Sequence, residues 1–140
     1  MIRGCPSCGT RNRVPPANLA DSGTCGKCKA ALPPVTEPIE ADPALFEEIT
    51  RAAKVPVLVD FWAAWCGPCT LAAPEVAKTA QSMSGRAIVL KVDTDAHPAL
   101  AEKFGVTGIP NFVVMKNGEV VFQQAGLARQ SEMEGWLRRY

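Results

Sequence analysis

The sequence predicts an α/β domain with a central mixed sheet, preceded by a small cysteine-rich module. Beyond residue 42, short apolar runs typical of buried strands alternate with segments of helical periodicity. Near the C-terminus, the pair Asn117-Gly118 separates two apolar runs, which predicts a β-hairpin. By contrast, residues 1–30 hold four of the six cysteines and few large apolar side chains. A segment of that composition needs a cross-link to fold.

The predicted elements follow one another in the order β-α-β-α-β-α-β-β-α. The first helix is expected to start at Asp42-Pro43, because Asp is a good N-cap and Pro suits the first helical position. Strands joined through helices should pair parallel, and the closing hairpin should add antiparallel strands. We expect strands at 37–41, 55–61, 87–92, 111–115 and 120–124, and helices at 44–53, 66–83, 98–104 and 130–139.

Three regions are expected along the chain. Residues 1–30 form the cysteine-rich module, residues 31–41 form a linker and the first strand, and residues 42–140 form the α/β domain. Prolines at 33, 34 and 38 favour an extended linker.

The composition narrows the function classes. Of the 140 residues, 47% are hydrophobic and 21% charged, and the formal net charge is +1. A charge so near zero argues against nucleic acid or an acidic membrane surface as the main partner. No run of about 20 apolar residues could span a membrane, and the N-terminal residues lack the apolar stretch of a secretory leader. We therefore expect a cytoplasmic protein. We also expect a monomer.

The central motif is the pair Cys66 and Cys69, placed where a buried strand ends and a helix begins. Unpaired N–H groups and the helix dipole favour a thiolate at a helix N-terminus. Cys66 is therefore expected to be the exposed nucleophile. Cys69 lies one turn further along the same face, within reach of a disulfide.

Three other residues near the dithiol are candidates for a role in the reaction or in binding. Asp60 interrupts an apolar strand, and a buried acid there could exchange the Cys69 proton through a water molecule. Lys91 could pair with Asp60 or extend to the edge of the sheet, and the sequence leaves both open. Trp65, beside the thiol, is expected to offer partners a flat apolar platform.

These residues resemble the active site of the thioredoxin family. Trp65-Cys66-Gly67-Pro68-Cys69, preceded by Val-Asp-Phe-Trp-Ala, is similar to its signature, and the resemblance extends over residues 37–140. Pro74 matches a proline of the active-site helix, and Gly108-Ile109-Pro110 matches a loop with a cis-proline facing the dithiol. Further matches are Ala125-Gly126 at the substrate groove, and Asp60 with Lys91.

The resemblance implies a thioredoxin fold and a thiol–disulfide oxidoreductase that reduces protein disulfides. It implies that an NADPH-dependent thioredoxin reductase restores the dithiol. Cys66, Cys69 and Asp60 would carry the chemistry. The residues expected to bind substrate are Trp65, Gly67, Pro68, Ile109, Pro110 and Gly126.

The first four cysteines form a second motif. Cys5 and Cys8 are followed after sixteen residues by Cys25 and Cys28. Two Cys-x-x-Cys pairs separated by about 15–20 residues are typical of zinc sites. Four thiolates leave no open position, so the Zn²⁺, one per chain, would be structural. The layout resembles the zinc-binding subclass of bacterial thioredoxins.

The sequence is also compatible with other readings of these cysteines and of the whole chain. The four N-terminal cysteines could form two further redox disulfides or hold iron. The whole chain could instead be a zinc- and redox-sensing binding module on a thioredoxin platform, or an oxidant or isomerase.

Overall fold

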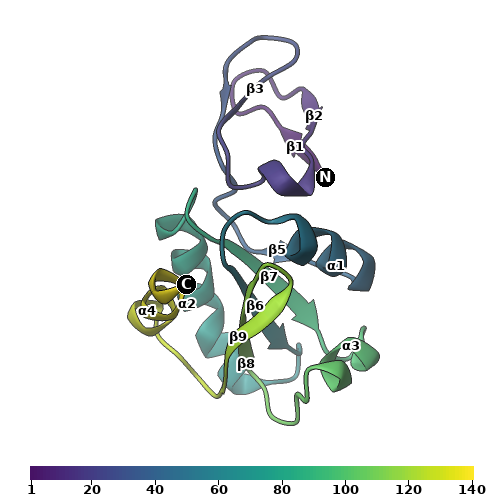
Figure 1. Cartoon of the computed structure of the whole chain (residues 1–140), viewed down its shortest axis with the longest axis vertical. Helices are drawn as coiled ribbons and strands as arrows, with labels where there is room; N and C mark the ends of the chain where they lie inside the picture. The colour runs from purple at the N-terminus through teal and green to yellow at the C-terminus, as the bar shows by residue number, and fades with distance from the viewer.

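The computed structural model describes residues 1–140, and Figure 1 shows two small hairpins stacked on one end of an α/β domain. In the first hairpin, β1 (Ile2–Gly4) pairs with β2 (Arg11–Arg13). In the second, β3 (Gly23–Thr24) pairs with β4 (Ala31–Leu32). The short 3-10 helix η1 (Pro16–Asn18) connects them. Each hairpin carries one Cys-x-x-Cys pair at its turn.

The α/β domain is built on a five-stranded sheet in the order β5-β7-β6-β8-β9. Its strands are β5 (Ile39–Glu40), β6 (Val57–Trp62), β7 (Ile88–Asp93), β8 (Asn111–Lys116) and β9 (Glu119–Ala125). β5 and β6 lie parallel to β7, whereas β8 is antiparallel to β6 and β9 antiparallel to β8. This confirms the predicted mixed sheet and the order of its elements.

The closing hairpin turns as its sequence predicts. Asn117 has φ 54° and Gly118 has φ 79°. A two-residue turn with both φ angles positive matches the right-handed twist of the strands it joins.

Helices cover both faces of the sheet. α1 (Pro43–Ala52) and α3 (Pro98–Lys103) lie on one face, and α2 (Gly67–Ser82) and α4 (Gln130–Arg139) on the other. Phe46 of α1 packs in the same core cluster as Val59, whereas Val76 of α2 packs with Leu58. Since successive residues of a strand point to opposite faces, Asp60 shares the α2 face with Leu58.

The N-terminal hairpins share apolar core with the α/β domain. Leu19 is 1% exposed and belongs to the same cluster as Val35 and Ile39. The α2–β7 turn at Gly85 lies beside Ala20. Ion pairs Arg3–Glu37 at 3.0 Å and Lys54–Asp21 at 2.7 Å flank this contact. The hairpins therefore dock where α2 ends, away from its N-terminus (Figure 1).

None of the helices is both long and apolar enough to cross a membrane.

Candidate active site and metal centre

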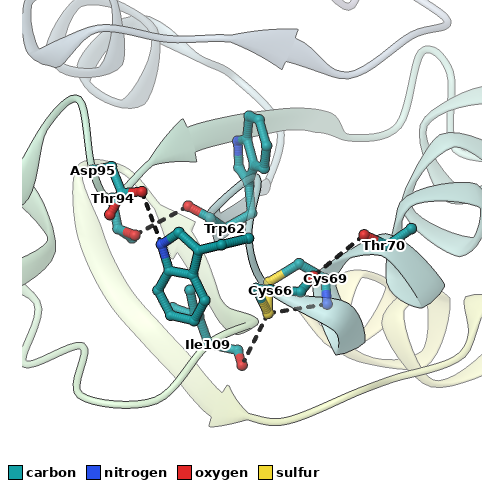
Figure 2. Close-up of a disulfide and its surroundings, with 8 residues drawn as sticks. Trp62, Cys66, Cys69, Thr70, Thr94, Asp95 and Ile109 are labelled. Atoms are coloured by element: carbon teal, nitrogen blue, oxygen red, sulfur yellow. Dashed lines mark hydrogen bonds between the residues drawn. A yellow bond between two sulfur atoms is a disulfide. The ribbon is translucent and has the colours of Figure 1, made fainter.

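The two central cysteines lie at the start of α2 and form a disulfide, with their Cα atoms 5.2 Å apart (Figure 2). Cys66 is the N-cap residue of this helix, in extended conformation. Its Sγ accepts a hydrogen bond from the Cys69 backbone N–H at 3.2 Å. A sulfur in the N-cap position thus satisfies one of the unpaired N–H groups of the first turn. The same geometry would stabilise a thiolate on Cys66 after reduction.

The prediction that Cys66 is exposed is wrong for this state of the protein. Cys66 is 4% exposed and Cys69 is 6% exposed. Both pack in a small cluster with Ala63, and Trp62 and Ile109 border it. The position at a helix start favours a thiolate, but it does not determine how far the sulfur is covered. That cover comes from Ala63 and Trp62 just before it and from Ile109 in a distant loop.

The prominent surface beside the dithiol is Trp65, which is 71% exposed. Its indole N–H donates to Asp95 Oδ2 at 2.8 Å. Gly67 and Pro68 open α2 and are exposed. Sequence reasoning missed Asp95. Its position just after β7 could have indicated it. Because β6 and β7 are parallel, their carboxyl ends meet at one edge of the sheet, where the dithiol lies.

A second loop faces the dithiol. The Ile109–Pro110 peptide bond is cis, as predicted. The Ile109 carbonyl oxygen lies 3.6 Å from Cys66 Sγ (Figure 2). Gly126, with φ 100°, donates its backbone N–H to the Pro110 carbonyl at 2.8 Å. The structure therefore brings Ile109, Pro110 and Gly126 together on the Cys66 side of the site.

Asp60 is buried, with 2% of its surface exposed, and its Oδ1 has no hydrogen-bond partner. Burial raises the pKa of its carboxyl to about 7, while the charge of Lys91 acts in the opposite direction. The two alternatives for Lys91 are also resolved. Its Nζ lies 4.0 Å from Glu40 Oε1, so its ion-pair partner is Glu40 and not Asp60.

The four N-terminal cysteines converge although they come from different hairpins. Their sulfurs all lie within 4.8 Å of one another, with Cys5 and Cys28 sulfurs 3.6 Å apart and Cys8 and Cys25 sulfurs 3.7 Å apart. A tetrahedron with Zn–S bonds of about 2.3 Å has S···S edges of roughly 3.8 Å. No disulfide joins these cysteines. The residues therefore fit a single four-thiolate metal ion, which counts against two additional redox disulfides.

Hydrogen-bond donors surround these sulfurs. The Lys27 N–H donates to Cys25 Sγ at 3.4 Å, and the Asn12 amide donates to the same sulfur at 3.6 Å. Backbone N–H groups of Cys28 and Lys27 lower the pKa of the Cys25 thiol to about 6. Donors of this kind favour the deprotonated ligands that a metal requires. Sequence reasoning missed Asn12, which lies in the first hairpin, far along the chain from the sulfur it contacts.

A dithiol held across the first turn of a helix, with one sulfur stabilised by a helix N–H, can exchange two electrons with another disulfide. By class, the molecule is a thiol–disulfide oxidoreductase. The family model described as Thioredoxin matches residues 37–139, and the model described as Thioredoxin 2, N-terminal, a zinc ribbon, matches residues 4–30. The chain belongs to the thioredoxin family.

Known relatives agree with this membership. Thioredoxin C-3 of Corynebacterium nephridii is 41% identical over 137 residues, which cover 98% of this chain and 93% of the relative. The thioredoxin of Haemophilus influenzae is 32% identical over 76% of this chain and 99% of its own. A solved structure of a mutant thioredoxin from Halobacterium salinarum superposes with a TM-score of 0.68 at 33% identity, covering 75% of this chain and 91% of that one.

Proposed function

We propose that the chain reduces disulfides of other proteins through Cys66, and the observation that carries this assignment is the hydrogen bond from the Cys69 N–H to Cys66 Sγ. Family membership supports disulfide-containing proteins as substrates and a thioredoxin reductase as the source of electrons. We propose further that this reductase is NADPH-dependent, and that the protein works as a cytoplasmic monomer.

In the proposed mechanism, the Cys66 thiolate attacks one sulfur of a substrate disulfide. A Cys66–substrate disulfide forms, the substrate S–S bond breaks, and the leaving thiolate takes up a proton. Cys69 then loses its proton to Asp60 through a water molecule and attacks Cys66 Sγ. The mixed disulfide breaks, Cys66 and Cys69 become the oxidised pair, and the substrate leaves with two electrons and a second proton.

Surrounding residues position the substrate. We assign Trp65, exposed beside the pair, as the platform on which an incoming chain packs. The Ile109 backbone, next to Cys66, would pair with an extended substrate strand, and Pro110 would present a compact ring without an N–H donor. Gly67, Pro68 and Gly126 complete the proposed contact surface.

For the N-terminal module, we propose one structural Zn²⁺ held by Cys5, Cys8, Cys25 and Cys28. The ion would cross-link the two hairpins, which have little apolar core of their own. We propose the division into residues 1–30, 31–41 and 42–140, with the redox reaction confined to the last part. Removal of residues 1–34 should therefore eliminate zinc binding while leaving insulin-disulfide reduction detectable.

The roles of the two central cysteines are tested by single substitutions in the full chain. Cys66→Ser should abolish insulin-disulfide reduction, and Cys69→Ser should accumulate mixed disulfides with substrates, visible by non-reducing electrophoresis. Adducts from Cys66→Ser and none from Cys69→Ser would reverse the assignment. An unchanged reduction rate in both variants would reject the proposed function. It would favour the alternative in which the chain is a zinc-sensing module.

A further inference from the structure

Three charged side chains form a row across the sheet beneath α2. Asp60 on β6 is the register partner of Lys91 on β7, and Lys91 is the register partner of Glu40 on β5. Paired residues of neighbouring strands point to the same face. The row leads outward: Asp60 is 2% exposed, and the side chains of Lys91 and Glu40 are 21% and 57% exposed.

Lys91 is in the middle of this row, and its ammonium group is paired with Glu40 at the outer end. Its Nζ lies 4.0 Å from Glu40 Oε1 and 4.6 Å from the centre of the Trp62 ring. It forms no ion pair with Asp60, whose Oδ1 also lacks a hydrogen-bond partner. The interior of the row is therefore underpaired, although a cation is one strand away.

From this geometry we propose that Glu40 is a positioning residue, which holds Lys91 away from Asp60 and so sets the proton affinity of the buried carboxylate. The inference rests on the proposed function, in which Asp60 takes the Cys69 proton. The carboxylate of Glu40 acts twice, since it competes for the cation and adds a negative charge to the same row. Both effects disfavour an ionised Asp60.

The pKa values agree in direction. Burial is the main cause of the raised pKa of Asp60, Lys91 opposes it, and Glu40 raises it further. Burial likewise raises the pKa of Glu40, against the charge of Lys91. Glu40 lies on the exposed edge and Asp60 in the interior, so desolvation penalises the charge of Glu40 less and makes it the stronger competitor for Lys91.

The other ionisable neighbours do not substitute for Glu40. Asp93 and His97 act on Glu40 with opposite signs. The Asp93 carboxylate accepts hydrogen bonds from the Asp95 and Ala96 N–H groups, so its Oδ1 is engaged in the turn after β7. On the other side of Asp60, its partner on β8 is the uncharged Phe112. In the first two turns of α2 the one side chain that could ionise is Cys69, and its sulfur is held in the disulfide with Cys66.

The test compares Glu40→Gln with Glu40→Asp in the full-length, zinc-loaded, oxidised protein. The titration of Asp60 is followed by carboxyl ¹³C NMR. With Glu40 two strand spacings, or roughly 10 Å, from Asp60, Coulomb's law gives a fall in the Asp60 midpoint of about half a pH unit for Glu40→Gln. Glu40→Asp retains the charge and should stay near wild type. Because Glu40 is mostly exposed, both variants should fold.

Glu48→Gln is the matched control, since it removes an exposed carboxylate on α1, at the opposite face of the sheet. The proposal would be overturned if the titration midpoint of Asp60 moved no further in Glu40→Gln than it does in Glu48→Gln. Equal shifts in Glu40→Gln and Glu40→Asp would also overturn it, since they would indicate a structural effect. Because this readout does not involve turnover, it is independent of whether Cys66→Ser abolishes insulin reduction, which tests the proposed function separately.

Discussion

Trp65 and Asp95 are joined by a hydrogen bond of 2.8 Å from the indole N–H to the carboxylate, at the rim of the dithiol. The aromatic ring is 71% exposed, so its orientation depends on this single polar anchor and not on surrounding packing. A rigid platform costs less conformational entropy when a partner docks on it than a mobile one.

Removing that anchor should weaken docking and leave the chemistry intact. In Asp95→Ala, we expect the KM for a protein disulfide to rise about 3–10-fold at unchanged kcat, the effect of losing one hydrogen bond of ordinary net strength. Asp95→Asn keeps an acceptor oxygen and should show a smaller rise. Steady-state kinetics with insulin measure both, and equal KM values in wild type and Asp95→Ala would contradict the anchoring role.

Asp60 should destabilise the folded protein above neutral pH. Burial raises its pKa from 3.8 to about 7, so the folded state holds the proton more tightly than the unfolded state. Between these values, rising pH ionises Asp60 in the unfolded chain first, and stability falls as pH rises. Asp60→Asn removes this penalty and should be more stable than wild type by roughly 2–4 kcal/mol at pH 8.

At pH 4 and below, the Asp60→Asn variant and wild type should differ little, because Asp60 is protonated in the fold. Urea denaturation of the oxidised proteins at both pH values measures the difference. The resolving step should slow in this variant and lose its rise with pH near 7. A stability gain that is the same at pH 4 and pH 8 would show that it does not come from ionisation.

Asn12 should control how firmly the metal is held. Its amide donates to Cys25 Sγ, and its Oδ1 accepts the Gly26 N–H at 2.9 Å, so one side chain joins the two hairpins. Loss of an outer-shell partner commonly reduces metal affinity about 10–100-fold. We expect Asn12→Ala to release zinc correspondingly faster to a chromogenic chelator. Asn18→Ala, which removes only an exposed bond to Asp21, should release zinc at the wild-type rate.

Equal rates of zinc release from Asn12→Ala and Asn18→Ala would show that Asn12 does not help to hold the metal.

Leu19 should stabilise the α/β domain although it belongs to the N-terminal part of the chain. The three tryptophans are at 62, 65 and 136, so their fluorescence reports only on the α/β part. Leu19→Ala should lower the stability measured by that signal by about 2–4 kcal/mol, as for other buried leucines. Leu32→Ala is the matched control, because Leu32 is buried with Cys5 and Cys25, outside the main core.

Leu32→Ala should accelerate zinc release and barely move the fluorescence transition. If Leu19→Ala left that transition unmoved as well, the hairpins would contribute nothing to the stability of the α/β domain.

Much of the molecule follows from local sequence. Short apolar runs predicted the strands, Asp42-Pro43 predicted the start of α1, and Asn117-Gly118 predicted the closing turn. The expected bounds of the last helix, 130–139, are those of α4. Cysteine spacing predicted both sulfur sites. Apart from the sixteen-residue gap between the metal-site cysteine pairs, these features depend on residues close together in sequence, through capping, turn geometry and periodicity, so they can be read along the chain.

The environment of each reactive group was decided only by the tertiary structure. Cys66 is covered because the Ile109 loop, more than 40 positions away, closes over a helix N-terminus that the motif alone leaves open. Lys91 pairs with Glu40 because parallel strands bring β5 beside β7. Leu19 enters the α/β core because η1 packs beside α1. Burial and ionisation depend on atoms brought together from distant segments, and no local pattern encodes those contacts.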